Sequence, residues 1–298
     1  MIEKRPRLAL IITLMLFGTI GTISRFVDLP SAFMSCARAL ISTVVIVSYI
    51  YMSGRRPDFD AIRANALRIF LAGVCMSLNW VLMFEAFRLT SVAIASLLYY
   101  MQPIFLMLCA PVCFGERLSI KKTMCIVTAF LGMVLVTGVL SPSVLSGGTS
   151  ATVSAAPGHI KGALFAIMAA VLYTANVVIN KKFKRDINPI DSTCSQIFIA
   201  GMVLLPYVWM TTDVSSLSFN ARSILLLLLL SVVHTGIAYI VYYTSSRLLE
   251  AQTIAILGYI DPVESVLLSA FLLKEPLSVR TIIGAVLILG STSIGSKD

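Results

Sequence analysis

Charge is scarce in this 298-residue sequence. Asp, Glu, Lys and Arg together make up 12% of the residues, against 58% hydrophobic residues and a mean hydropathy of +0.94. Soluble domains carry roughly 25% charged residues. One globular core cannot enclose so much apolar surface, so we expect lipid to cover it. The composition therefore excludes a soluble globular domain.

Sequence motifs of ATP hydrolysis and of intramembrane catalysis are also missing. The chain has no Walker phosphate loop, which excludes coupling to ATP within it, and it has neither His-Glu-x-x-His nor Gly-x-Gly-Asp. The six cysteines lie in apolar runs, and Cys109 and Cys113 share a helix face without His or acidic neighbours. We therefore expect no catalytic residues, no metal and no cofactor.

Ten apolar runs are long enough to span a bilayer, which takes about 20 residues. They cover about 8–27, 31–52, 66–88, 91–113, 121–140, 161–180, 189–211, 222–246, 250–273 and 278–295. With the N-terminus in the cytoplasm, 16 of the 23 Lys and Arg residues fall on that side and six on the other. This asymmetry predicts that both termini are cytoplasmic, and it explains the net charge of +9 by membrane orientation rather than by nucleic-acid binding.

The chain contains an internal duplication. Residues 88–119 align without a gap with residues 247–278, and nine of the 32 positions are identical. The informative matches are Arg88/Arg247, Tyr100/Tyr259, Pro103/Pro262, Glu116/Glu275 and Ser119/Ser278. Each copy holds five spans, so the second must enter the bilayer from the opposite side, as an inverted repeat. We predict an all-α membrane protein with repeats at 1–140 and 161–298, joined by an extramembrane linker at 141–160 that is rich in Ser, Gly, Ala and Thr.

These features resemble the EamA-type branch of the drug/metabolite transporter superfamily. The resemblance rests on the two five-span repeats, the prolines in Gln102-Pro103 and Asp261-Pro262, the Glu-x-Leu-Ser turns that follow them, and Arg38 early in the second span. It implies a cavity lined mainly by spans 1, 3, 4, 6, 8 and 9, a small-molecule substrate, and a multi-pass protein of the bacterial inner membrane. Whether such a protein is a monomer or a homodimer stays open.

Ionisable residues inside membrane spans raise the free energy of insertion into the bilayer, and they usually serve a function. Asp261 and Glu264 are three residues apart and so share a helix face, and one of two poorly hydrated carboxyls should hold a proton near neutral pH. Together with Glu85 and His234 they are the candidates for proton coupling. The alternatives are a packing ion pair for the two carboxyls, a local Glu85–Arg88 pair, and a neutral hydrogen-bonded histidine.

Arg38 suits a carboxylate in geometry, but the family resemblance favours a structural ion pair. Pro103 and Pro262 should interrupt their spans and free carbonyls near Tyr99 and Gly258, next to Gln102 and Asp261. Aromatic and amide side chains lie on the same spans. The predicted substrate-binding residues are Asn79, Trp80, Tyr99, Gln102, Tyr173, Asn176, Tyr239, Tyr259 and Asp261.

The pattern favours a secondary transporter that exports a small metabolite, such as an amphiphilic amino acid, by alternating access, either driven by protons or independent of them. An uncoupled, channel-like facilitator is the first alternative. An intramembrane enzyme is the second, and the missing motifs weaken it. Phosphorylated substrates would need several basic groups at mid-depth, which the sequence does not supply.

Overall fold

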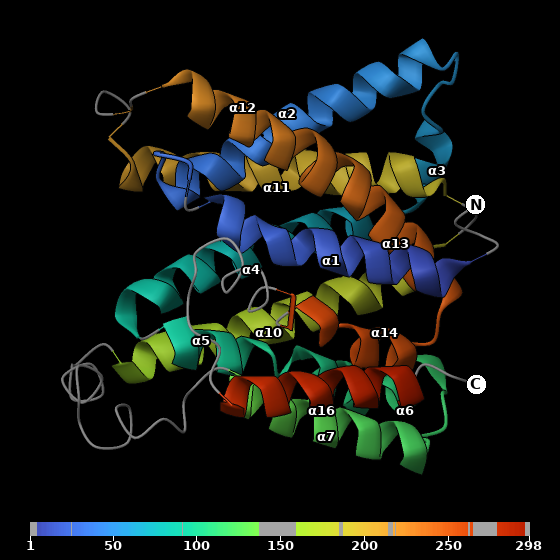
Figure 1. Cartoon of the computed structure of the whole chain (residues 1–298). Helices are drawn as coiled ribbons and strands as arrows, with labels where there is room; N and C mark the ends of the chain where they lie inside the picture. Colours follow the sequence, from blue (N-terminus) through green and yellow to red (C-terminus); the bar gives the residue numbers. More distant parts are fainter. Residues whose placement is uncertain are drawn as a thin grey trace. The chain divides into compact units, whose positions relative to one another are not determined.

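In a computed structural model, the described residues are 5–24, 26–90, 92–136, 159–184, 187–213, 217, 219–261, 263, 264 and 279–295. Every regular element among them is helical (Figure 1). The helices are α1 (Pro6–Ser24), α2 (Ser31–Met52), α3 (Phe59–Ala64), α4 (Ala66–Leu89), α5 (Val92–Tyr99), α6 (Gln102–Phe114), α7 (Ile120–Val136), α10 (His159–Lys181), α11 (Pro189–Thr211), α12 (Ala221–Leu229), the π-helix η3 (Leu230–Ile237), α13 (Ala238–Leu248), α14 (Ala251–Leu257) and α16 (Val279–Gly295).

Six helical stretches of the described residues are long and apolar enough to cross a membrane. They are Ser31–Met52, Ala66–Leu89, Ala95–Phe114, Ile160–Lys181, Pro189–Thr211 and Ala221–Leu248, with shorter apolar helices at Pro6–Ile20 and Ile282–Gly295. The all-helical prediction is therefore confirmed for the described part of the chain. The count of ten spans stays a prediction, because residues 262 and 265–273 of the expected ninth span, as well as residues 141–158 of the expected linker, lie outside the described residues.

The helices divide into two compact units that each combine segments from both halves of the sequence. Unit 1 comprises Met1–Val81 and Ala175–Leu248, and unit 2 comprises Leu82–Thr174 and Leu249–Asp298. Two of the three boundaries fall inside α4 and α10, and the third follows the end of α13. The candidate residues can therefore be described unit by unit.

In unit 1, α2 packs along α11 and against η3, and α1 packs along α13. Gly201 lets α2 and α11 approach closely, because a Cβ there would lie 2.8 Å from Leu40 Cδ2. Local capping fixes two helix starts. Asp58 accepts from Ala61 N at the start of α3, and Asn188 accepts from Ile190 N at the start of α11, where Pro189 occupies the first turn.

In unit 2, a carboxylate from the duplicated motif caps a helix far away in sequence. Glu116 Oε1 accepts from Ala251 N at 2.9 Å, at the start of α14, where Glu250 supplies no side-chain cap. The Gln252 side chain in turn bonds to the turn after Glu116: it accepts from Ser119 N and donates to Arg117 O. The repeated Glu-x-Leu-Ser turn therefore has a structural role in its first copy. Its second copy, Glu275–Ser278, lies outside the described residues.

Helices α7 and α16 of unit 2 lie side by side at a glycine contact (Figure 1). A Cβ on Gly132 would lie 2.7 Å from Gly284 O and 2.9 Å from Ile288 Cγ1. We expect Gly132→Ala to lower the free energy of unfolding by about 1–3 kcal/mol, because backbone atoms cannot move aside as a flexible side chain does. Titration with SDS in mixed micelles would measure it.

Gly290 in α16 provides the matched control. Nothing lies within 4 Å of a Cβ built there, so Gly290→Ala should leave stability unchanged or raise it by up to about 1 kcal/mol. Equal stability of the two variants would contradict the close approach of α7 and α16.

Candidate functional site

Arg38 is held inside unit 1 with no carboxylate partner among the described residues. The residue is 7% exposed, its Nε donates to Thr235 Oγ1 at 3.0 Å, and its Cζ lies 5.9 Å from the centre of the Trp80 ring. Three ion pairs form among the described residues, and none of them includes Arg38. The expected structural ion pair is therefore not formed with any described carboxylate. A hydroxyl and an aromatic face hold the guanidinium instead.

The π-helix η3 supplies the hydroxyl that orients Arg38. Thr235 Oγ1 donates to Leu230 O five residues back at 3.0 Å, while Ser42 of α2 donates to Ser231 O at 2.7 Å. A π-turn widens the helix and frequently occurs at functional sites. Neither the π-turn nor the role of Thr235 was predictable from the sequence, because hydropathy over 222–246 is that of an ordinary apolar span.

His234 is enclosed within unit 1 by short polar contacts. It is 3% exposed, its Nε2 lies 2.7 Å from Thr19 Oγ1, and its Nδ1 lies 3.4 Å from Leu229 O. Thr19 in turn donates to Leu16 O at 2.8 Å. These contacts fit the hydrogen-bonded role of the histidine, and a role in proton coupling stays a prediction.

Aromatic rings gather beside Arg38. The centre of the Tyr239 ring lies 5.0 Å from that of Phe17, 5.8 Å from that of Tyr243 and 6.3 Å from that of Trp80. Tyr242 joins the cluster through Phe17 at 5.8 Å. Three of these residues, Phe17, Trp80 and Tyr239, are only partly buried.

A buried amide network lies on α10 and α11 of unit 1. Asn180 and Gln196 exchange two side-chain hydrogen bonds of 2.9 Å, and neither has exposed surface. Asn176 accepts from Tyr243 OH at 2.9 Å and donates to Ala72 O at 2.7 Å. Because protein groups already engage both ends of its amide, Asn176 fits helix packing better than substrate binding. Asn79, also predicted to bind substrate, is 5% exposed.

In unit 2, the helix interruption expected at Pro103 is present. Helix α5 ends at Tyr99 and α6 begins at Gln102, with Pro103 in its first turn, where no backbone N–H is needed. The rings of Tyr99 and Tyr173 meet edge to face at 6.3 Å, and Thr174 Oγ1 donates to Gln102 O at 3.3 Å. The break therefore brings three of the predicted substrate-binding residues of unit 2 together.

The matching interruption follows α14, which ends at Leu257. Helical structure resumes at Ile260 and Asp261 and continues at Glu264, while Pro262 lies outside the described residues. The Tyr100 hydroxyl is hydrogen-bonded to the Asp261 carboxyl. Asp261 and Glu264 lie close enough to interact electrostatically.

Three polar atoms near these breaks are buried and have no hydrogen-bond partner among the described residues: Gln102 Oε1, Tyr259 OH and Glu264 Oε2. Leaving such atoms unpaired costs about 1–3 kcal/mol each. A ligand, a proton or ordered water would offset that cost. All three belong to residues that the sequence analysis assigned to the site.

Glu85 of unit 2 forms the local pair expected from its spacing. Arg88 Nη1 lies 2.9 Å from Glu85 Oε1, and the Arg88 side chain is 69% exposed. An exposed pair of this kind contributes about 0–1 kcal/mol. A role for Glu85 in proton coupling stays a prediction.

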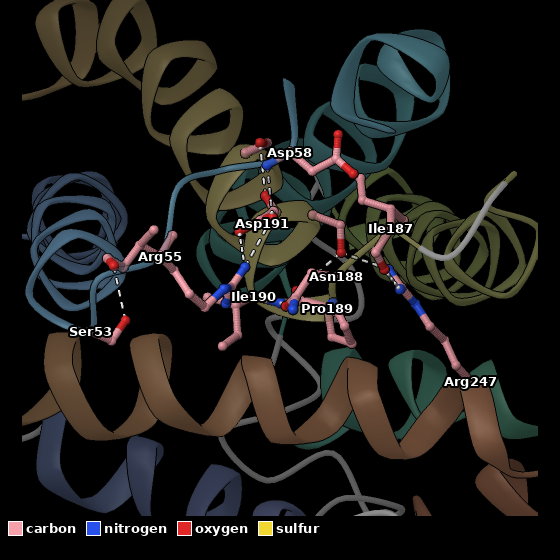
Figure 2. A network of polar contacts seen from close by, with 12 residues as sticks. Ser53, Arg55, Asp58, Ile187, Asn188, Pro189, Ile190, Asp191 and Arg247 are labelled. Atoms are coloured by element: carbon pink, nitrogen blue, oxygen red, sulfur yellow. Dashed lines mark hydrogen bonds and ion pairs between the residues drawn. The ribbon is translucent and has the colours of Figure 1, made fainter. Parts of the chain in front are cut away.

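A further ionic network at one end of unit 1 was not foreseen. Figure 2 shows Arg55 and Asp58 reaching Asp191 in the first turn of α11, with Arg55 Nη2 3.0 Å from Asp191 Oδ1. Arg247 Nη1 donates to Ile187 O at 2.9 Å, and its Nη2 donates to Ser192 Oγ at 2.6 Å. The network joins the chain after α2 to the start of α11 and the end of α13, so it stabilises the unit.

Apolar helical units with broken helices, partly buried carboxyls and a buried arginine define an integral membrane protein of the transporter class. The sequence pattern of the EamA-like transporter family matches residues 6–138 and again residues 160–295. The chain therefore belongs to the EamA-like transporter family, and it is a multi-pass membrane transporter.

Relatives support the same class. An uncharacterized transporter of Bacillus subtilis, YxxF, is 26% identical over 259 residues, which cover 87% of this chain and 79% of the relative. An uncharacterized transporter of Archaeoglobus fulgidus is 23% identical over 97% of this chain and 96% of its own length. Mouse solute carrier family 35 member G1 is 29% identical over 52% of this chain and 41% of its own length.

A solved crystal structure has the same fold. It matches with a TM-score of 0.84 and covers 98% of this chain and 97% of that chain. At 18% sequence identity, this likeness concerns the fold alone.

Proposed function

We propose that the protein is a secondary transporter that exports a small amphiphilic metabolite from a bacterial cell by alternating access. In this proposal, ten spans form two inverted repeats, 1–140 and 161–298, around a linker at 141–160, with both termini in the cytoplasm. Efflux follows from the family resemblance, and the orientation follows from the distribution of Lys and Arg.

The observation that carries the proposal is the pair of helix interruptions in unit 2, with carboxyl groups beside one of them. Interrupted helices expose backbone groups that bind solutes and ions in many transporters. Here Gln102 Oε1 and Tyr259 OH have no hydrogen-bond partner among the described residues, and the Tyr100 hydroxyl is hydrogen-bonded to Asp261. The substrate-binding residues are accordingly those predicted from the sequence, apart from Asn176.

Proton coupling is assigned to Asp261 and Glu264. Two interacting carboxyls in a poorly hydrated setting share one proton more readily than they bear two charges. Their counterparts in the first repeat are Gln102 and Phe105, so only one repeat supplies this chemistry. Uncoupled facilitation is the competing function, and it predicts flux that does not respond to a pH gradient.

A flux assay in proteoliposomes distinguishes the two functions. Radiolabelled apolar amino acids are the probes, and uptake is measured with and without an imposed pH gradient in the absence of ATP. We expect Asp261→Asn and Glu264→Gln each to abolish the response to the gradient, because a neutral amide cannot bind and release the proton.

The exposed Asp60→Asn change in α3 controls for loss of one carboxyl elsewhere in the chain. A gradient response that is unchanged in both site variants would reject the coupling. Flux that is insensitive to the gradient in the unmodified protein would favour the facilitator.

A further inference from the structure

Arg38 carries a buried positive charge that the described part of the protein does not neutralise. The residue is 7% exposed, and it lies seven residues after the start of α2, the only Lys or Arg in that helix. The ion pairs of the described residues join Arg55 to Asp191, Arg88 to Glu85, and Lys122 to Glu250. An uncompensated buried charge is strongly unfavourable, so a retained one is a functional-site candidate.

The guanidinium of Arg38 is hydrogen-bonded to a described residue through Nε alone. Nε donates to Thr235 Oγ1 at 3.0 Å, and Thr235 is itself anchored to Leu230 O. Nη1 and Nη2 donate to no described residue. The residue as a whole is 7% exposed. A planar fork held in this way is organised for two parallel hydrogen bonds to an anion.

The neighbours of Arg38 select among anions. The Trp80 ring lies against the guanidinium at 5.9 Å, and Tyr239 and Phe17 extend the apolar wall. A phosphate or an oligoanion would want further basic groups, whereas α2 supplies only this one. One arginine beside aromatic rings suits a single carboxylate attached to an apolar body.

We propose that Arg38 is the anchor for the carboxylate of the transported solute, with Thr235 positioning its guanidinium and the rings of Trp80 and Tyr239 receiving the apolar part. This inference rests on the proposed transport function and names its substrate class as small apolar monocarboxylates, including zwitterionic amino acids. The anionic headgroup of a lipid offers the same chemistry to the arginine, so the experiment must separate the two sources.

The test is equilibrium binding to the purified full-length protein in a neutral maltoside detergent, measured by titration calorimetry. The probes are 3-phenylpropanoate and 4-methylpentanoate, the neutral amides of both, and inorganic phosphate. We expect the unmodified protein to bind the carboxylates at least about tenfold more tightly than the amides or phosphate, since hydrogen bonds to a charged group contribute that much or more.

Three variants locate the effect. Arg38→Gln should weaken binding of the carboxylates about tenfold or more and leave binding of the amides unchanged, while Arg38→Lys should keep part of the preference. Thr235→Val keeps the charge but loses the acceptor that orients it, so a loss of a few-fold is expected. Arg63→Gln, the same change on an exposed residue of unit 1, should bind like the unmodified protein.

Several outcomes overturn the proposal. They are amides that bind as tightly as carboxylates, carboxylate affinity that survives Arg38→Gln, and failure of every carboxylate to bind. If Arg38→Gln does not fold, the Thr235→Val and Arg38→Lys affinities decide: values equal to those of the unmodified protein would refute the anchor.

Two further experiments, one with lipid and one measuring flux, separate binding of a lipid headgroup and binding without transport from the proposal. Phosphatidylglycerol added to phosphatidylcholine nanodiscs should not compete with 3-phenylpropanoate, and competition that depends on Arg38 would assign the site to a headgroup. Arg38-dependent binding without flux in liposomes would leave the anchor standing and reject transport. Flux that does not depend on Arg38 would leave the transport function standing and reject Arg38 as the anchor.

Discussion

Arg55→Gln is expected to lower the free energy of unfolding by about 3 kcal/mol, more than Asp191→Asn at the other end of the same ion pair. The asymmetry follows from exposure. The Asp191 side chain is 1% exposed and would keep a buried, unpaired charge, whereas the Arg55 side chain is 33% exposed and reaches water when Asp191 is changed. The start of α11 and the N–H of Asp58 still stabilise the carboxylate, so the effect should lie at the low end for a broken buried pair.

Asp191→Asn should cost about 1.5 kcal/mol, the contribution of a charged hydrogen bond. Both values are measured by SDS titration in mixed micelles, with the exposed Arg63→Gln as the control for loss of one guanidinium. Equal destabilisation by Arg55→Gln and Asp191→Asn would contradict the burial of Asp191.

Gln196→Leu is expected to lower the free energy of unfolding by about 1–3 kcal/mol. The change removes the donor to Asn180 Oδ1, and Asn180 has no exposed surface through which water could replace it. Asn180 Nδ2 keeps its contact with Asn176 O at 3.0 Å, so the unpaired oxygen accounts for most of the loss.

The double variant Asn180→Leu/Gln196→Leu tests the pairing. With both amides gone, no unpaired polar atom is left at this position, so the double variant should be less destabilised than the sum of the two single variants. Additive losses would show that the two amides do not interact.

Hydropathy predicted the helices well, because burial in lipid depends on local composition. The apolar run at 31–52 coincides with α2, and the run at 189–211 coincides with α11. The break before Pro103 was also predictable, since proline cannot donate to the preceding turn.

The contacts between distant segments were not predictable from local patterns. Nothing in residues 222–246 indicates that eight of their positions form a π-helix, because a π-turn depends on contacts such as Ser42 to Ser231 O and Arg38 to Thr235. For the same reason, the sequence did not indicate that one unit combines Met1–Val81 with Ala175–Leu248. A repeat shows that two segments are alike, but it does not show which segments pack together.

The candidate site was predicted in its residue types more than in its contacts. Asp261, Tyr259 and Gln102 do lie at helix breaks, as the duplicated prolines indicated. Arg38 was expected in an ion pair, whereas its described contacts are Thr235 and Trp80. The sequence showed that Arg38 lies within a span, but it did not show which residues contact the guanidinium.

Tracer counterflow tests the proposed transport most directly. Proteoliposomes preloaded with unlabelled apolar amino acids are diluted into a trace of the same compounds in radiolabelled form, without ATP. We expect transient, saturable accumulation of label that exceeds the equilibrium level and falls sharply in Arg38→Gln. Label that enters no faster than in protein-free liposomes would contradict the proposed transport.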